Sequence, residues 1–203
     1  MSYYIRILGT SDPDIHIDEL IDGLNEVGLS AKFSRAELES AAKWSVLLVA
    51  NEAGDEIMQI ERNPIIEGDL GLEELSEFRE SIEDYKPASA ARWLLSFFDR
   101  VKVIYAFQLL GAAFENDNFT VINSVREIIW NKTGGIFQSD AEGFTNEEGY
   151  AILWQFSDEA KGEWNMAVHD GDGQWIRFTM DLADEKQREE FWAGKVPESA
   201  FRL

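Results

Sequence analysis

The chain has 203 residues, of which 39 are acidic and 18 basic, so its formal net charge is −21, and it contains no cysteine. The absence of cysteine excludes disulfides, thiolate metal sites and cysteine nucleophiles, and the lack of a basic run argues against direct binding of nucleic acid or of an anionic membrane. Because 45% of the residues are hydrophobic, unlike in disordered acidic chains, we expect a folded protein with a sizeable core.

The first 63 residues predict a strand, a helix and then three more strands. Apolar residues at helical spacing between Ile17 and Val27 predict the helix, and Gly28 is typical of the residue that ends one. A polar turn containing Gly54 separates two apolar segments and predicts a β-hairpin. The predicted strands span residues 3–8, 31–35, 44–50 and 56–61.

Residues 64–100 predict a loop followed by two helices of different character. The first helix has an almost wholly acidic outer face. Pro87 is suited to the first turn of the second helix, whose aromatic and leucine side chains on most sides predict burial. The apolar stripe of the first helix is narrow and consists of Leu72, Leu75, Phe78 and Ile82.

The remainder of the chain predicts strands and two helices, ending in a tail that we expect to be loose or to lie on the surface. Gly134 and Gly135 are expected to end the first of these helices. An Asp-Gly turn predicts a hairpin near the end of the chain. The predicted strands are 101–110, 136–139, 150–156, 164–168 and 175–180, the helices are 119–130 and 183–192, and the tail is 194–203.

The order strand, helix, weak strand, strong strand, strand occurs twice, at offsets that drift from 100 to 107 residues. We therefore predict an α+β fold of two pseudo-repeated βαβββ-like antiparallel sheet units, with a helical pair, residues 72–99, inserted between them. We expect residues 1–203 to form a single compact domain, with internal halves 1–63 and 101–182 joined by the helical segment 64–100. The alternative is that an α+β chain can be aligned with itself in this way without any duplication.

Motifs of common catalytic sites are absent from the sequence. His16 and His169 are the only histidines, and the chain has neither a Gly-x-Ser-x-Gly elbow nor a glycine-rich phosphate-binding loop. Residues 170–173 resemble the start of a calcium loop, but its twelfth position is Asp181 in place of the usual glutamate. We favour a hairpin turn there, and we expect no metal and no cofactor.

The acidic residues are concentrated, because residues 52–84 hold twelve of them and only two basic residues. A one-sided acidic surface speeds association with a basic partner. Our first hypothesis is therefore a non-enzymatic acidic protein that docks a basic protein, as an inhibitor or immunity protein would; the alternative is that the acidity serves solubility alone. The predicted partner-binding residues are Glu73, Glu74, Glu77, Glu80, Glu83 and Asp84.

The second hypothesis is a small-molecule or cation-binding domain, which would include a carboxylate-based enzyme. Paired carboxylates can act as acid and base or bind a cation, and tryptophans would supply apolar walls. A third reading is a structural or oligomeric accessory protein. The predicted pocket residues are Asp140, Glu142, Trp154, Trp164, His169, Asp170 and Asp172.

The sequence also carries an expectation about the compartment. Residues 1–9 lack the charged region and the long apolar stretch of a signal peptide. No run reaches the ~18 apolar residues that a membrane span requires. We therefore expect a cytoplasmic protein.

Overall fold

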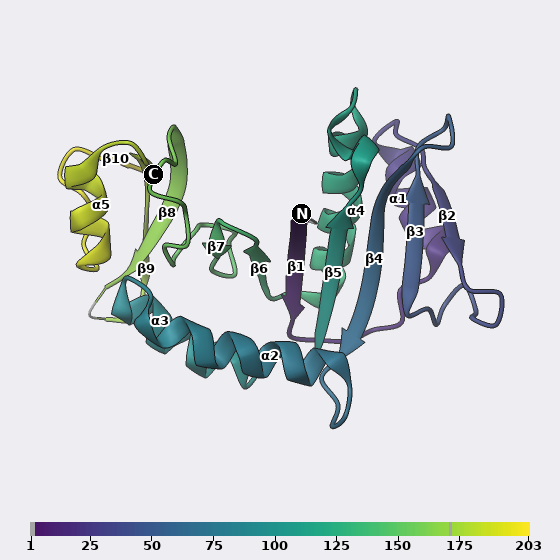
Figure 1. Cartoon of the computed structure of the whole chain (residues 1–203), viewed down its shortest axis with the longest axis horizontal. Coiled ribbons are helices and arrows are strands. Elements are labelled where there is room, and N and C mark those ends of the chain that lie inside the picture. Colours follow the sequence, from purple (N-terminus) through teal and green to yellow (C-terminus); the bar gives the residue numbers. More distant parts are fainter. Residues whose placement is uncertain (1–2, 171) are drawn as a thin grey trace. The chain divides into compact units, whose positions relative to one another are not determined.

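The computed structural model describes residues 3–170 and 172–203, and its helices and antiparallel strands confirm the α+β class (Figure 1). Contacts divide the chain into two compact units, and each unit combines two separate stretches of sequence. Over the described residues, no helix has both the length and the apolar character needed to cross a membrane. The predicted single domain with its internal halves stays a prediction.

The first unit comprises Met1–Gly71 and Val101–Gly135, and the second comprises Leu72–Arg100 and Ile136–Leu203. The chain therefore passes from one unit to the other three times. Each unit needs a segment that the chain supplies only after it has built part of the other unit.

The described residues of the first unit form a sheet of five antiparallel strands, in the order β2-β3-β4-β5-β1. The last of them in sequence, β5, lies inside this order, with β1 on one side and β4 on the other. All of its residues except Gln108 are buried, as its almost wholly apolar sequence leads one to expect of a central strand. The strands are β1 (Tyr3–Gly9), β2 (Lys32–Arg35), β3 (Val46–Ala50), β4 (Glu56–Pro64) and β5 (Val103–Leu109).

Two helices, α1 (Ile17–Glu26) and α4 (Asn118–Thr133), lie side by side on one face of these strands (Figure 1). Helix α1 begins with a capping box in which His16 Nδ1 accepts from the N–H of Asp18 (3.3 Å) while the His16 N–H donates to the Glu19 carboxylate (2.9 Å). His16 therefore has a structural role, as its position before a predicted helix suggests.

A buried polar group lies at the centre of the first unit. Tyr105 of β5 is fully buried, and the Trp44 ring packs edge-on against it with the centroids 5.8 Å apart. Its register partner on β4, Arg62, donates from Nε (2.9 Å) and Nη2 (2.5 Å) to the two carboxylate oxygens of Asp12. The Tyr105 hydroxyl has no hydrogen-bond partner among the described residues, and burial raises its pKa to about 12 despite the positive charge of Arg62.

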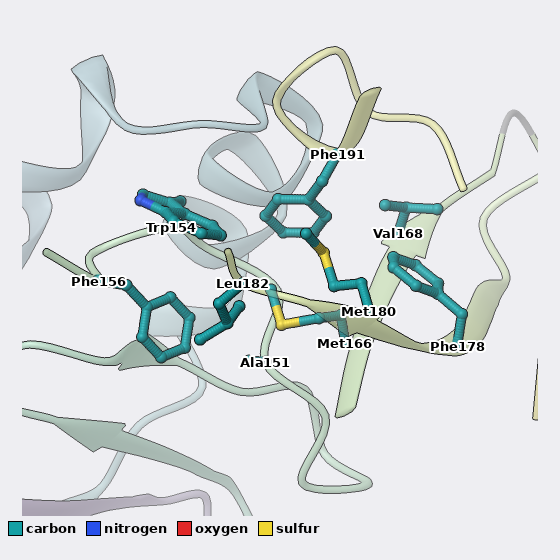
Figure 2. Packing of buried hydrophobic residues seen from close by; sticks show 9 residues of the cluster. All are labelled: Ala151, Trp154, Phe156, Met166, Val168, Phe178, Met180, Leu182 and Phe191. Atoms are coloured by element: carbon teal, nitrogen blue, oxygen red, sulfur yellow. The ribbon is translucent and has the colours of Figure 1, made fainter. Parts of the chain in front are cut away.

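The described residues of the second unit form the hairpin β6-β7 and a three-stranded antiparallel sheet in the order β10-β9-β8. Its core contains Trp154 and Phe191, with aromatic and methionine side chains around them (Figure 2). The strands are β6 (Ile136–Ser139), β7 (Gly143–Phe144), β8 (Glu163–His169), β9 (Trp175–Asp181) and β10 (Phe201–Arg202). The helices are α2 (Leu70–Ser81), the 3₁₀ turn η1 (Ile82–Asp84), α3 (Ala88–Phe98) and α5 (Glu185–Trp192).

One predicted strand is wrong. Residues 150–156 do not form a strand; Ala151 makes isolated bridges to Thr145 and Met166, while the apolar residues after it are buried in irregular backbone. A short apolar run predicts burial but does not by itself distinguish a strand from other buried segments. Of the two alternatives expected for the C-terminal tail, the structure shows the second: the tail lies on the surface, where the exposed β10 pairs with β9 and covers part of a strand edge that would otherwise be open.

The predicted pseudo-repeat is not confirmed. The strand expected to open the second repeat is β5, which pairs between β4 and β1 of the first unit. In the second predicted repeat, the strand expected near Ile152 does not form. Sequence order alone does not specify which strands pair.

The pKa of Tyr105 leads to a pH-dependent stability. Folding raises this pKa from 10.0 to about 12, so the unfolded chain loses the phenolic proton at a lower pH than the folded chain. The free energy of unfolding should therefore fall between about pH 10 and about pH 12, by at most about 3 kcal/mol. Urea unfolding across this range should show that Tyr105→Phe removes this loss, whereas Tyr85→Phe, at an exposed tyrosine, should retain it. An unchanged pH dependence in Tyr105→Phe would contradict the assignment.

Gly135 provides a test of backbone constraint in the first unit. Its φ is +96°, and a Cβ there would lie 2.0 Å from the Leu8 carbonyl oxygen. Gly28 also has a positive φ, +74°, but a Cβ there would meet no described atom within 4 Å. Gly28→Ala should lower the free energy of unfolding by about 1 kcal/mol, and Gly135→Ala by more than about 2 kcal/mol, in urea unfolding. Equal costs would show that backbone strain alone, without the clash, determines the effect.

Candidate functional site

The outer side of α2 and η1 carries a row of exposed carboxylates. Their spacings of three and four residues bring them to one side of the helix, while Leu75 and Ile82 are buried. None of them forms an ion pair or a hydrogen bond through its side chain within residues 3–170 and 172–203. We call this set the acidic face: Glu73, Glu77, Glu80, Glu83 and Asp84.

The basic residue of α2 does not neutralise this face. Arg79 donates from Nη1 to the carbonyl oxygen of Leu95 (3.2 Å) and from Nη2 to the Asp99 carboxylate (2.7 Å). Its guanidinium carbon also lies 5.7 Å from the centre of the Phe98 ring. The charge of Arg79 is thereby held against α3. Glu74, the sixth predicted residue, is partly buried and has an interaction of its own.

The second predicted set of residues does not line a single cavity. His169 and Asp170 line a cavity of about 850 Å³ within the second unit. Trp164 lines a different hollow beside Asn165 and Thr179. Trp154 is buried in the core cluster (Figure 2).

The remaining predicted residues lie in turns. Asp140 and Glu142 are half-buried in the β6-β7 turn and belong to neither lining. Asp172 is exposed, and its N–H and that of Gln174 both donate to Asp170 Oδ1 (2.9 and 2.8 Å). This geometry confirms the hairpin turn; Gly171 lies outside the described residues. Within the described part of the chain, no group of three or more histidine, aspartate or glutamate side chains is arranged to hold a metal ion.

Three segments of the second unit build the 850 Å³ cavity. They are the start of α3 with the residues before it, the end of β8, and the end of α5. The first segment contributes Lys86, Ser89, Arg92 and Trp93, and the last contributes Trp192. These five residues were not predicted as site residues. The signal in the sequence was a pair of basic residues around Pro87, at the start of a predicted helix, directly after a strongly acidic segment.

Aromatic contacts fix one wall of the cavity. The Trp93 ring stacks on Phe97 and meets Trp175 edge-on, with centroids 5.1 Å apart in both pairs. The His169 ring meets Trp175 edge-on, with the centroids 4.9 Å apart. The rings of this wall are therefore packed against one another, and the wall is mostly apolar.

No family model matches the chain, and searches of curated proteins and of solved structures find no significant match either. The functional argument therefore depends on the geometry and charge of the acidic face and of the cavity.

The turn at Asp170 can be tested against the calcium-loop alternative. Asp170→Ala removes the acceptor of two backbone N–H groups and should lower the free energy of unfolding by about 1 to 2 kcal/mol. Asp172→Ala, at an exposed side chain with no described partner, should change it by less than about 0.5 kcal/mol. Thermal unfolding with and without calcium should give the same midpoint for the unmodified protein. A calcium-dependent midpoint that both substitutions remove would contradict the turn-only role.

Proposed function

We propose that the chain is a non-enzymatic binding protein that docks a basic protein partner through its acidic face. The observation that carries this proposal is the placement of Arg79, whose charge is engaged on α3 while five carboxylates face outward without a described partner. An inhibitor or immunity-type role fits such a face, because both steering of a basic partner and occlusion of its site need dense negative charge.

The spacing of the acids favours recognition over solubility. Like charges three and four residues apart on a helix destabilise it by a few tenths of a kcal/mol per pair. Solubility requires net charge but no clustering of charge on one face. A basic partner would relieve the repulsion within the acidic face, so the arrangement is most favourable in a complex.

The same charge disfavours direct contact with nucleic acid and with an anionic membrane, and we retain both exclusions as part of the proposal. A cytoplasmic location, which the sequence predicts, also belongs to it. The carboxylate pocket around Asp140, Glu142 and His169 receives less support, because the cavity lined by His169 includes neither carboxylate.

Charge reversal with a matched control tests the proposal. The variant Glu73→Lys/Glu77→Lys/Glu80→Lys changes the acidic face. The control variant is Glu159→Lys/Glu163→Lys/Glu189→Lys, which changes the net charge by the same amount at exposed sites of the second unit. Both variants and the unmodified protein should be used as baits in affinity capture, after circular dichroism has established that all three are folded.

We expect one basic protein to be captured by the unmodified bait and by the control, lost with the acidic-face variant, and released at ~0.5 M salt, where the Debye length is about 4 Å. The complex should then be rebuilt from the two purified proteins, and calorimetry should show a loss of at least about tenfold in affinity for the acidic-face variant alone. Equal capture by both variants would attribute binding to net charge and overturn the acidic face as the docking site.

A further inference from the structure

The cavity of the second unit combines features that the acidic face lacks. Its volume, about 850 Å³, lies within the range of small-molecule sites. Its lining residues belong to α3, β8 and α5 or directly adjoin these elements, whose regular backbone can hold a fixed geometry. This cavity is lined by two basic side chains although the chain as a whole carries a net charge of −21.

The basic side chains are available to a ligand. Lys86 and Arg92 are exposed, and neither forms an ion pair within the described residues. They flank the start of α3, where no acidic residue occupies the first turn and no side chain of the described residues caps the helix. Uncapped N–H groups and the helix dipole add to the positive potential at this end.

Two buried polar atoms provide an independent observation. Ser89 Oγ and Trp192 Nε1 are shielded from solvent and have no hydrogen-bond partner among the described residues. Both belong to residues that line the cavity, and both can donate a hydrogen bond. Unpaired buried donors are costly and call for an explanation. The oxygens of an anionic group bound in this cavity are acceptors suited to such donors.

The aromatic residues that line the cavity determine which ring system of a ligand it favours. Trp93 and Trp192 present indole surfaces, and each is held by an edge-on aromatic neighbour, Trp175 and Trp154 respectively. Such surfaces favour a planar ring. Asp170 also lines the cavity, but its carboxylate accepts two N–H groups of its own turn. Its negative charge disfavours an anion at the β8 end and favours the α3 end.

We infer that this cavity binds a small aromatic anion, with its phosphate or carboxylate group at Lys86, Arg92 and the start of α3, and its ring against Trp93 and Trp192. This site shares no residue with the acidic face, and its charge is opposite. The inference therefore does not depend on the proposed docking function.

The test uses two aromatic anions, adenosine monophosphate and indole-3-acetate, and their uncharged counterparts, adenosine and indole-3-ethanol. At least one anion should bind saturably with a Kd below about 1 mM, and at least about tenfold more tightly than its counterpart. The anion that binds more tightly shows which combination of acidic group and aromatic ring the cavity prefers. Absence of saturable binding by both anions, or equal binding of an anion and its counterpart, would overturn the inference.

The indole N–H signals in a nitrogen-15 NMR spectrum report the location of binding. The Trp192 signal, assigned with Trp192→Phe, should move on titration. The Trp130 signal is an internal control, because this N–H already donates to the Gly135 carbonyl oxygen (3.0 Å) in the first unit. Movement of the Trp130 signal without that of Trp192 would place the ligand elsewhere and overturn the inference.

Matched charge variants complete the test. Lys86→Gln/Arg92→Gln should weaken binding of the anion at least about tenfold and leave the uncharged counterpart unaffected. Lys161→Gln/Arg202→Gln removes the same charge at exposed residues outside the cavity lining and should leave binding unchanged. Equal losses in the two variants would show a general charge effect and overturn the site. The acidic-face variant should still bind the anion, which separates this result from that of the docking proposal.

Discussion

The first unit depends on the position of β5. This strand pairs with β1 on one side and β4 on the other, so the sheet is incomplete until the chain has built α2 and α3 and returned. Tyr105 at its centre is fully buried, and the Asp12–Arg62 pair lies beside it. The contacts that stabilise this unit are therefore long-range, and the inserted helices must be accommodated without interrupting the sheet.

Helix α3 has a comparable importance in the second unit. Near its C-terminal end, the carbonyl of Leu95 and the carboxylate of Asp99 bind Arg79 and so leave the acidic face of α2 without a counter-charge. Ser89 and Arg92 at its N-terminal end, and Lys86 just before it, line the cavity. One helix thus separates negative charge on its neighbour from positive charge at its own start. This separation gives a very acidic chain two surfaces of opposite charge, for each of which we propose a binding role.

The two surfaces suggest different physical modes of recognition. Binding at the acidic face would be dominated by Coulomb attraction and would respond strongly to salt. Binding in the cavity would combine charge-assisted hydrogen bonds with burial of an aromatic ring, and would be limited in affinity by the negative potential of the whole chain. A ligand and a partner protein could therefore be recognised by one chain through unrelated residues.

Local patterns in the sequence determined much of this protein: the α+β class, helices α1 to α5, the hairpins β3-β4 and β8-β9, and the acidic row on α2 all follow from periodicity, turn residues and charge. Tertiary structure decided the rest. The position of β5, the irregular backbone of residues 150–156 and the pairing of β10 depend on partners far away in sequence, which a local pattern does not specify. The cavity, too, exists only because three distant segments converge, and the withdrawal of Arg79 onto α3 is a contact between two helices. The periodicity of apolar residues indicates which face of a helix or strand is buried. Which other segment packs against that face is decided only when the whole chain folds.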